Sequence, residues 1–360
     1  MDQNQERNFR THYYEKVRFF PTVEEKKSVE SLLKEQPIQK EKLGQFCLRF
    51  GIPAVYRTYV WKLLLGVLPL NRSTEKYVWG HREEQVKELE RAAVLVRPQC
   101  LDETLEQKIL RMKLIEDGAL PIQDKFLEQD PTNQYFVSIA QAVSGLTSSE
   151  SEADLFWIST RFFRHISSNI YSSLPQFPEL TLQCLQKEDV DHRLHQHLCD
   201  LRMLEAPLLS FWFHTCFASV LPESALERIW DRVISGSAQI LVYVAVSILL
   251  TLRRPLLALT TSDDMLTYLK HIPEDCGDRI VNEALELLHK NSSQTAGKPD
   301  SPAGEDSGRS SGNKPGGGKP RQGSQDTSTP SDKVVRSLVE SKSVTIEIAR
   351  KSPNAGDKAG

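Results

Sequence analysis

The 360-residue sequence lacks the cysteine patterns that hold metals or form redox pairs. Its six cysteines stand at positions 47, 100, 184, 199, 216 and 276, and no two are spaced as Cys-x-x-Cys. That scatter speaks against the usual zinc and dithiol motifs, which need closely spaced thiols. Most of these cysteines have apolar neighbours, among which a free cysteine behaves as a small hydrophobic residue. We therefore expect no structural metal and a reduced, cytoplasmic setting.

The chain also has no long apolar run and no basic excess, and we expect no secretory leader. Its most apolar stretch, within 238–252, runs for about thirteen residues, whereas a membrane span needs ~20. The net charge of −3 is too low for nonspecific binding to nucleic acid. The first ten residues, MDQNQERNFR, are polar, unlike a signal peptide. We predict no transmembrane segment and no nucleic-acid partner.

The common catalytic motifs are missing as well. The sequence contains no Gly-rich phosphate loop, no His-Glu-x-x-His and no Gly-x-Ser-x-Gly. One histidine cluster, His192, His195 and His197, could approach a metal together with Cys199 or Asp200. No convincing ligand set completes it, so the simpler interpretation is a solvated helix face. We expect no cofactor.

The stretch 221–252 is the most informative part of the sequence. Pro222 suits the start of a helix, and Leu226, Ile229, Trp230 and Val233 then recur at three- and four-residue spacing. Gly236 offers the left-handed conformation that ends such a helix. A second helix, over 238–252, is apolar almost all round, which is typical of a helix buried on every side. The sequence therefore predicts a central helix of a helical domain.

Helical periodicity recurs along most of the chain, and we found neither an internal repeat nor persistent strand-like alternation. From Asn291 to about 332 the composition changes to Ser, Gly, Lys, Pro and Asp, which cannot bury enough apolar surface to offset ordering entropy. We predict an all-α protein with N-terminal helices in 1–44 that pack on a domain over 45–290, followed by a disordered tail over 291–360. The other predicted helices cover 1–20, 22–35, 39–50, the segment from 54, 75–97, 101–117, 134–147, 152–170, 179–187, 189–204, 208–220, 263–271 and 277–290, with a loop over 117–133.

Three motifs carry a resemblance to a known family. Gly51-Ile-Pro53 is followed by Arg57 and Trp61, an acidic entry leads into Phe-Trp157, and Trp230-Asp231 lies on the helix after a Leu-Pro pair. Over about 45–290 this combination resembles TBC domains, which are mainly GTPase-activating proteins for Rab GTPases. The resemblance implies a two-lobed all-α fold. It also implies that Arg57 is structural, and we expect Arg57 to pair with an acid, Asp231.

The same resemblance implies two catalytic side chains that we do not find. The family carries an arginine in Ile-x-x-Asp-x-x-Arg and a glutamine in Tyr-x-Gln. Here Asp117 is followed by Leu120 in the arginine position, and no arginine lies between Arg111 and Arg161. Ile139 stands where the tyrosine before Gln141 is expected. We therefore predict a domain with no catalytic residues. The alternative is an active Rab GTPase-activating protein that uses substitutes such as Arg111 or Gln141.

Together with the N-terminus RNFRTHYYEKVRF, the missing fingers resemble a non-catalytic branch of the family found in the tuberous sclerosis complex. That resemblance implies binding to the coiled coil of hamartin and, through it, to tuberin, whose action on Rheb restrains TOR signalling at lysosomes. We expect the partner surface on the helices 75–97 and 101–117. The alternative is that these residues only pack against the domain body. The candidate residues are Val86, Leu89, Ala93, Leu105 and Ile109.

Overall fold

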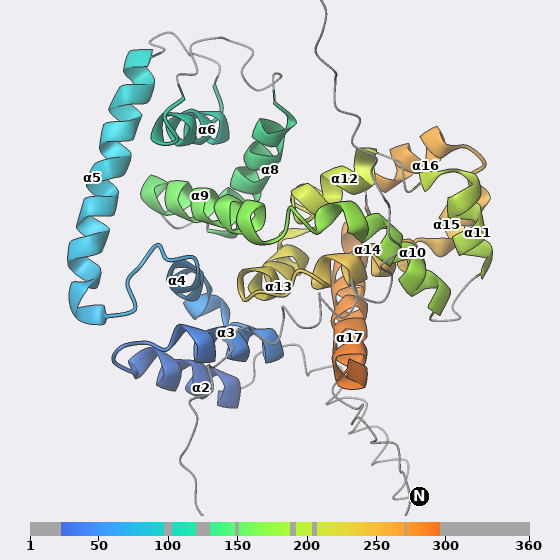
Figure 1. Ribbon diagram of the computed structural model, residues 1–360, viewed down its shortest axis with the longest axis horizontal. Helices are drawn as coiled ribbons and strands as arrows, with labels where there is room; N and C mark the ends of the chain where they lie inside the picture. The colour runs from blue at the N-terminus through green and yellow to red at the C-terminus, as the bar shows by residue number, and fades with distance from the viewer. Residues whose placement is uncertain are drawn as a thin grey trace, which may run out of the picture. The chain divides into compact units, whose positions relative to one another are not determined.

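The computed structural model describes residues 23–96, 103–119, 130–147, 151–187, 192–203, 207–270 and 272–295. Within these ranges every regular element is a helix and no strand occurs, which confirms the all-α prediction (Figure 1). The helix predicted over 1–20 lies outside the described residues. The disordered tail predicted over 291–360 begins too early, because residues 291–295 are helical, and the rest of it lies outside the described residues. The last described helix, α17 (Gly277–Thr295), continues five residues past its predicted end at 290.

Three helices begin the described chain. They are α2 (Val23–Lys34), α3 (Lys40–Arg49) and α4 (Ala54–Leu64), close to their predicted positions. Each packs against the next, and Pro53 serves as the N-cap of α4 with extended backbone angles. Proline suits a position at or just before the start of a helix, because the N–H group that it lacks would have no partner within the helix there. This places the Gly-Ile-Pro motif at the junction that positions Arg57 and Trp61.

A first group of helices packs together after α4. It comprises α5 (Arg72–Val96), α6 (Leu105–Glu116), α8 (Pro131–Leu146) and α9 (Glu152–Asn169), in which α5 contacts α6 and α9, and α8 contacts α6 and α9. Helix α6 begins at Leu105, four residues later than the prediction of 101. Thr104 and Gln107 form a capping box there, which satisfies backbone N–H groups at the start of the helix.

A second group surrounds α14 (Ile240–Thr251), where every residue from Ile240 to Leu249 is buried. This confirms the buried helix predicted from its all-round apolar sequence. Helix α10 (Phe177–Lys187) packs along α14, and α11 (His192–Asp200) packs against α10 and α15 (Arg253–Ala258). The remaining elements are η1 (Leu174–Gln176), α12 (Pro207–His214), α16 (Ser262–Leu269) and η3 (Glu274–Cys276).

Two local differences from the prediction concern the end of α12 and the segment after α14. Helix α12 ends at His214 instead of 220, because Cys216, Phe217 and Ser219 adopt positive φ angles of 49°, 64° and 61°. Residues other than glycine rarely adopt such angles, so no residue in this stretch predicts them. Helix α15 is an unpredicted short helix that starts two residues after α14 ends.

None of the described helices combines the length and apolarity that a membrane crossing requires.

Helix α13 (Glu223–Ile234) lies between the two groups, since it contacts α3, α4 and α8 on one side and α14 on the other (Figure 1). Gly236 follows it with a φ of +103°, the positive angle expected where this helix ends. The predicted stripe is buried, with Leu226, Ile229, Trp230 and Val233 each at most 2% exposed. The helix that carries Trp230-Asp231 thereby reaches the helix that carries Arg57.

Candidate functional site

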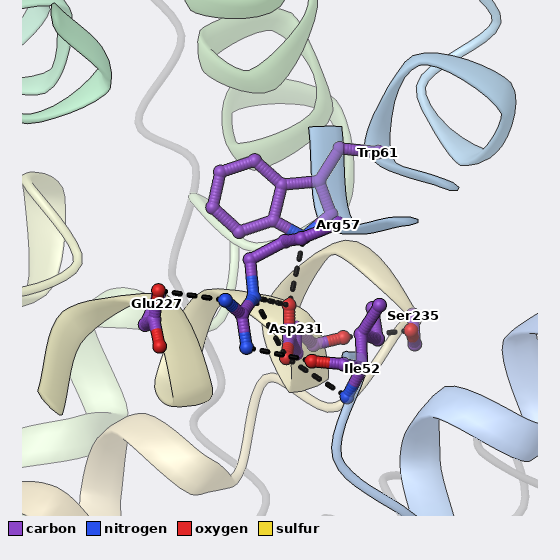
Figure 2. Close-up of polar contacts among 6 residues, drawn as sticks. All are labelled: Ile52, Arg57, Trp61, Glu227, Asp231 and Ser235. Atoms are coloured by element: carbon purple, nitrogen blue, oxygen red, sulfur yellow. Dashed lines mark hydrogen bonds and ion pairs between the residues drawn. The ribbon is translucent and has the colours of Figure 1, made fainter. Parts of the chain in front are cut away.

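The Arg57 and Asp231 side chains meet between α4 and α13 (Figure 2). Arg57 Nε donates to Asp231 Oδ1 at 3.3 Å and to Oδ2 at 3.4 Å. Asp231 is fully buried and Arg57 is 9% exposed. The structure thus forms the pair that the sequence analysis expects.

Further polar groups complete the surroundings of this pair. Trp61 Nε1 donates to Asp231 Oδ1 at 2.8 Å, and the Ile52 amide donates to Oδ2 at 3.4 Å. Arg57 Nη2 in turn donates to the Ile52 carbonyl oxygen at 2.7 Å. Arg57 Nη1 donates to Glu227 Oε2 at 2.7 Å, one turn before Asp231 on α13 (Figure 2). The Gly-Ile-Pro turn, α4 and α13 are therefore joined through one carboxylate.

Burial dominates the electrostatics of the two acids. Desolvation raises the pKa of Asp231 above its usual value, while Arg57, Arg232, Trp61 and the Ile52 amide lower it. Burial also raises the pKa of Glu227, whereas the positive charge of Arg57 lowers it. A charged carboxylate in this place depends on its donors, because an uncompensated buried charge is costly. The Asp231 carboxylate is closed to solvent, so its role is to hold the fold together.

The two other family tryptophans are also internal. Trp157 and Trp230 are both fully buried. Trp157 Nε1 donates to the Arg82 carbonyl oxygen at 3.1 Å, and Trp230 Nε1 donates to the Cys216 carbonyl oxygen at 3.0 Å. The second bond holds the strained turn after α12 against α13. These tryptophans therefore have structural contacts with satisfied indole N–H groups.

The two side chains proposed as substitutes for the catalytic fingers, Arg111 and Gln141, differ in their exposure to solvent. Arg111 on α6 is 3% exposed and forms an ion pair with Glu103. Gln141 on α8 is exposed. Asp117 ends α6 and accepts from Lys113 at 2.7 Å, whereas Leu120 lies outside the described residues. Arg111 would have to leave its buried partner before it could reach another protein.

The histidine cluster does not assemble as a ligand set. His197 Nε2 lies 2.8 Å from the Leu259 carbonyl oxygen, and His195 Nε2 lies 3.9 Å from Cys199 Sγ. Among the residues that the structure describes, no group of three or more His, Cys, Asp or Glu side chains could hold a metal ion.

The five residues expected to form a partner surface do not form one exposed face. Val86, Ala93 and Ile109 are at most 4% exposed, because α5, which carries Val86 and Ala93, packs against α9 and against α6, which carries Ile109. Leu89 is partly buried against the same core, and Leu105 is 37% exposed. The apolar residues that recur along α5 in the sequence thus form the face of the helix that is turned towards the core. The exposed apolar residues of α5 are Tyr77, Val94 and Leu95.

Two features of this region had no signal in the sequence. Lys62 and Asp154 form an ion pair of 2.7 Å between α4 and α9, in which both side chains are largely buried. The guanidinium groups of Arg82 and Arg161 lie 4.0 Å and 5.4 Å from the centre of the Trp157 ring. The Lys62–Asp154 pair and the approach of Arg82 to Trp157 join residues far apart along the chain, so spacing alone could not reveal them.

Comparisons with known proteins show which family and which relatives the chain is similar to. The model of the Rab-GTPase-TBC domain matches residues 55–257. The chain is 41% identical to TBC1 domain family member 7 of Homo sapiens over 293 residues, which cover 81% of this chain and 97% of that protein. It is 37% identical to the protein of the same name from Danio rerio, with the same coverage of both chains.

Solved structures show the same fold. The Ypt/Rab-GAP domain of Gyp1p matches with a TM-score of 0.53 and 18% identity, over 76% of this chain and 99% of that one. The Chlamydomonas flagellar RabGAP TBC domain matches with a TM-score of 0.51 and 16% identity, over 74% and 90% of the two chains. These likenesses show the two-lobed helical fold.

Proposed function

Because the chain belongs to the Rab-GTPase-TBC domain family, we propose that it is a non-catalytic TBC-domain subunit that binds a helical partner. The proposed partner is the coiled coil of hamartin, and through it tuberin. The subunit supports the GTPase-activating action of that complex on Rheb, and so restrains TOR signalling. Its proposed location is the cytoplasm, with recruitment to lysosomes or cytoplasmic vesicles as part of the complex.

The exposed apolar end of α5 carries this proposal. Val94 is 56% exposed and Leu95 is 79% exposed, on adjacent positions of the helix. They line an open hollow with Lys87, Glu90 and Arg91. Large apolar side chains held in water by a folded helix suit the apolar seam of a coiled-coil partner, and flanking charges suit its polar edges. The arrangement replaces the buried stripe of α5 as the candidate partner surface.

The lack of an available finger supports the non-catalytic part of the proposal. An arginine finger contributes about 10³–10⁵ in the rate of GTP hydrolysis by offsetting charge on the transferred phosphoryl group. The sequence has no arginine from 112 to 160, and Arg111 is held by Glu103 inside the domain.

Co-purification with the hamartin coiled coil tests the surface. Leu95→Glu places a charge on an exposed position, so it should abolish binding while leaving helicity and melting temperature unchanged. Val55→Glu is the matched control, since Val55 is 76% exposed on α4, and it should bind as the wild type does. Full retention of binding by Leu95→Glu would refute this surface. Leu89 is unsuited to the test, because its substitution would also disturb the core.

Single-turnover hydrolysis of GTP by a panel of Rab GTPases separates the proposal from its alternative. We expect no acceleration by the chain alone. Acceleration near 10³ that is lost in Arg111→Ala would favour an active enzyme instead.

A further inference from the structure

Two guanidinium groups meet at the buried Trp157 side chain, where α5 and α9 pack together. Arg82 comes from α5 and Arg161 from α9, and both lie within cation–π distance of the Trp157 ring. The hydrogen bond from Trp157 Nε1 to the Arg82 carbonyl oxygen anchors the backbone of α5 at this point. Both arginine side chains are partly exposed, so they remain accessible to a ligand from solvent.

Neither guanidinium has a carboxylate partner within the described ranges. The ion pairs found there do not include Arg82 or Arg161, and Arg161 Nε is buried without a hydrogen-bond acceptor. Burial lowers the pKa of both arginines, and the next contribution for each is a neighbouring arginine: Arg161 acts on Arg82, and Arg164 on Arg161. Like charges are therefore gathered here at an energetic cost.

The nearby acids neutralise only part of this charge. Arg164 lies 3.8 Å from Glu116 and 3.3 Å from Asp117, and Lys113 lies 2.7 Å from Asp117. Glu116 is also close enough to favour the charged forms of Arg82 and Arg161. Four cationic side chains thus face two carboxylates, which leaves an excess of two positive charges at one place.

We propose that Arg82, Arg161 and Arg164 form a binding site for a phosphomonoester dianion. The planar fork of a guanidinium binds phosphate oxygens through two parallel hydrogen bonds, and a phosphomonoester carries close to two negative charges at neutral pH. A single carboxylate would neutralise half of the excess. The site lies between helices and its side chains are half-buried, so it suits a phosphate that projects from a small soluble molecule or a side chain better than one spread on a bilayer.

The site is separate from the Arg57–Asp231 cluster and from the exposed end of α5. Val94 and Leu95 lie twelve and thirteen positions after Arg82 on α5, which corresponds to about 18 Å or more along a helix. A phosphomonoester could therefore bind whether or not the proposed helical partner does.

Calorimetric titration of the full chain with inorganic phosphate and with O-phosphoserine tests the proposal. We expect saturable binding at physiological salt, weakened about tenfold or more in Arg161→Gln and Arg82→Gln, since each loses charge-assisted hydrogen bonds. Arg49→Gln, an equal charge change at an exposed position at the end of α3, should bind like the wild type. Equal binding by wild type and Arg161→Gln would overturn the site.

A gain-of-binding variant guards against loss through unfolding. Glu116→Gln removes a negative charge beside the arginines, so it should tighten phosphate binding several-fold, and unchanged or weaker binding would contradict the proposal. Flotation with vesicles that carry phosphatidylinositol 4-phosphate distinguishes the sources. Binding to these vesicles without binding to phosphate or O-phosphoserine would overturn the assignment to a soluble ester. Lowered melting temperatures in both arginine variants, with no phosphate binding by the wild type, would show that the cluster only stabilises the helix packing.

Discussion

The Arg57 guanidinium and the Asp231 carboxylate, 174 positions apart, form a buried ion pair that joins α4, near the start of the TBC domain, to α13. The pair is not isolated, because the Trp61 indole and the Ile52 amide donate to the same carboxylate. Such a network is strong when complete, whereas a single lost member leaves a charge without compensation.

Arg57→Leu should accordingly destabilise the protein by about 3–5 kcal/mol, because Asp231 would remain buried without the guanidinium that donates hydrogen bonds to it. Urea denaturation followed by circular dichroism measures the change. The double variant Arg57→Leu with Asp231→Leu should lose less stability than the two single variants added together, since it removes both charges. Strict additivity would mean that the two side chains do not interact. Arg49→Leu, on the exposed end of α3, provides the control for a lost positive charge.

His165 makes folding stability dependent on pH. Its Nε2 atom lies 3.2 Å from the Val233 carbonyl oxygen, and the Asn169 side-chain amide lies 3.2 Å from Nδ1. A carbonyl oxygen on one side and an amide donor on the other specify the neutral ring with its hydrogen on Nε2. Burial lowers the pKa of His165 below the ordinary 6.5, although the Val233 carbonyl opposes this.

The sign of the effect follows from proton uptake. As pH falls below about 6.5, the unfolded chain binds a proton that the folded chain binds only at lower pH, so stability falls. The stabilising contribution is complete above the unfolded pKa and is lost as pH drops through the folded one. Melting temperatures between pH 7.5 and 5.5 should decline less steeply in His165→Gln than in the wild type. Equal slopes in the two proteins would contradict the prediction.

The sequence was informative wherever one segment contained its own signal. The stripe on α13, the apolar α14 and the turn at Gly236 all follow from local spacing, and the Arg57–Asp231 pair followed from the family motifs. The orientation of α5 could not be predicted from local spacing. Its regular stripe predicts which residues share a face, yet that face turned out to meet α6 and α9, while Val94 and Leu95 project into solvent.

Contacts between distant segments account for most of what was missed. The Lys62–Asp154 ion pair depends on how α4 lies against α9, and the approach of Arg82 to Trp157 and Arg161 depends on how α5 packs against α9. The turn after α12 was missed for another reason. Its positive φ angles fall on cysteine, phenylalanine and serine, which the surrounding packing and the Trp230–Cys216 hydrogen bond hold in place.

Two helical glycines should respond in opposite directions to the same substitution. Gly44, within α3, has open space around the position of an added Cβ, whereas a Cβ on Gly277 would collide with the Pro222 ring, at the N-cap of α13. Gly44→Ala should stabilise the protein by about 0.5–1 kcal/mol, because alanine loses less backbone entropy in a helix. Gly277→Ala should cost about 1–3 kcal/mol, because the rigid ring cannot move aside without shifting α13 or α17. Chemical denaturation of both variants gives the two values. If Gly277→Ala also stabilised the protein, the close approach of α17 to Pro222 would be wrong, since the entropy gain is the same at both positions and only the neighbouring ring differs.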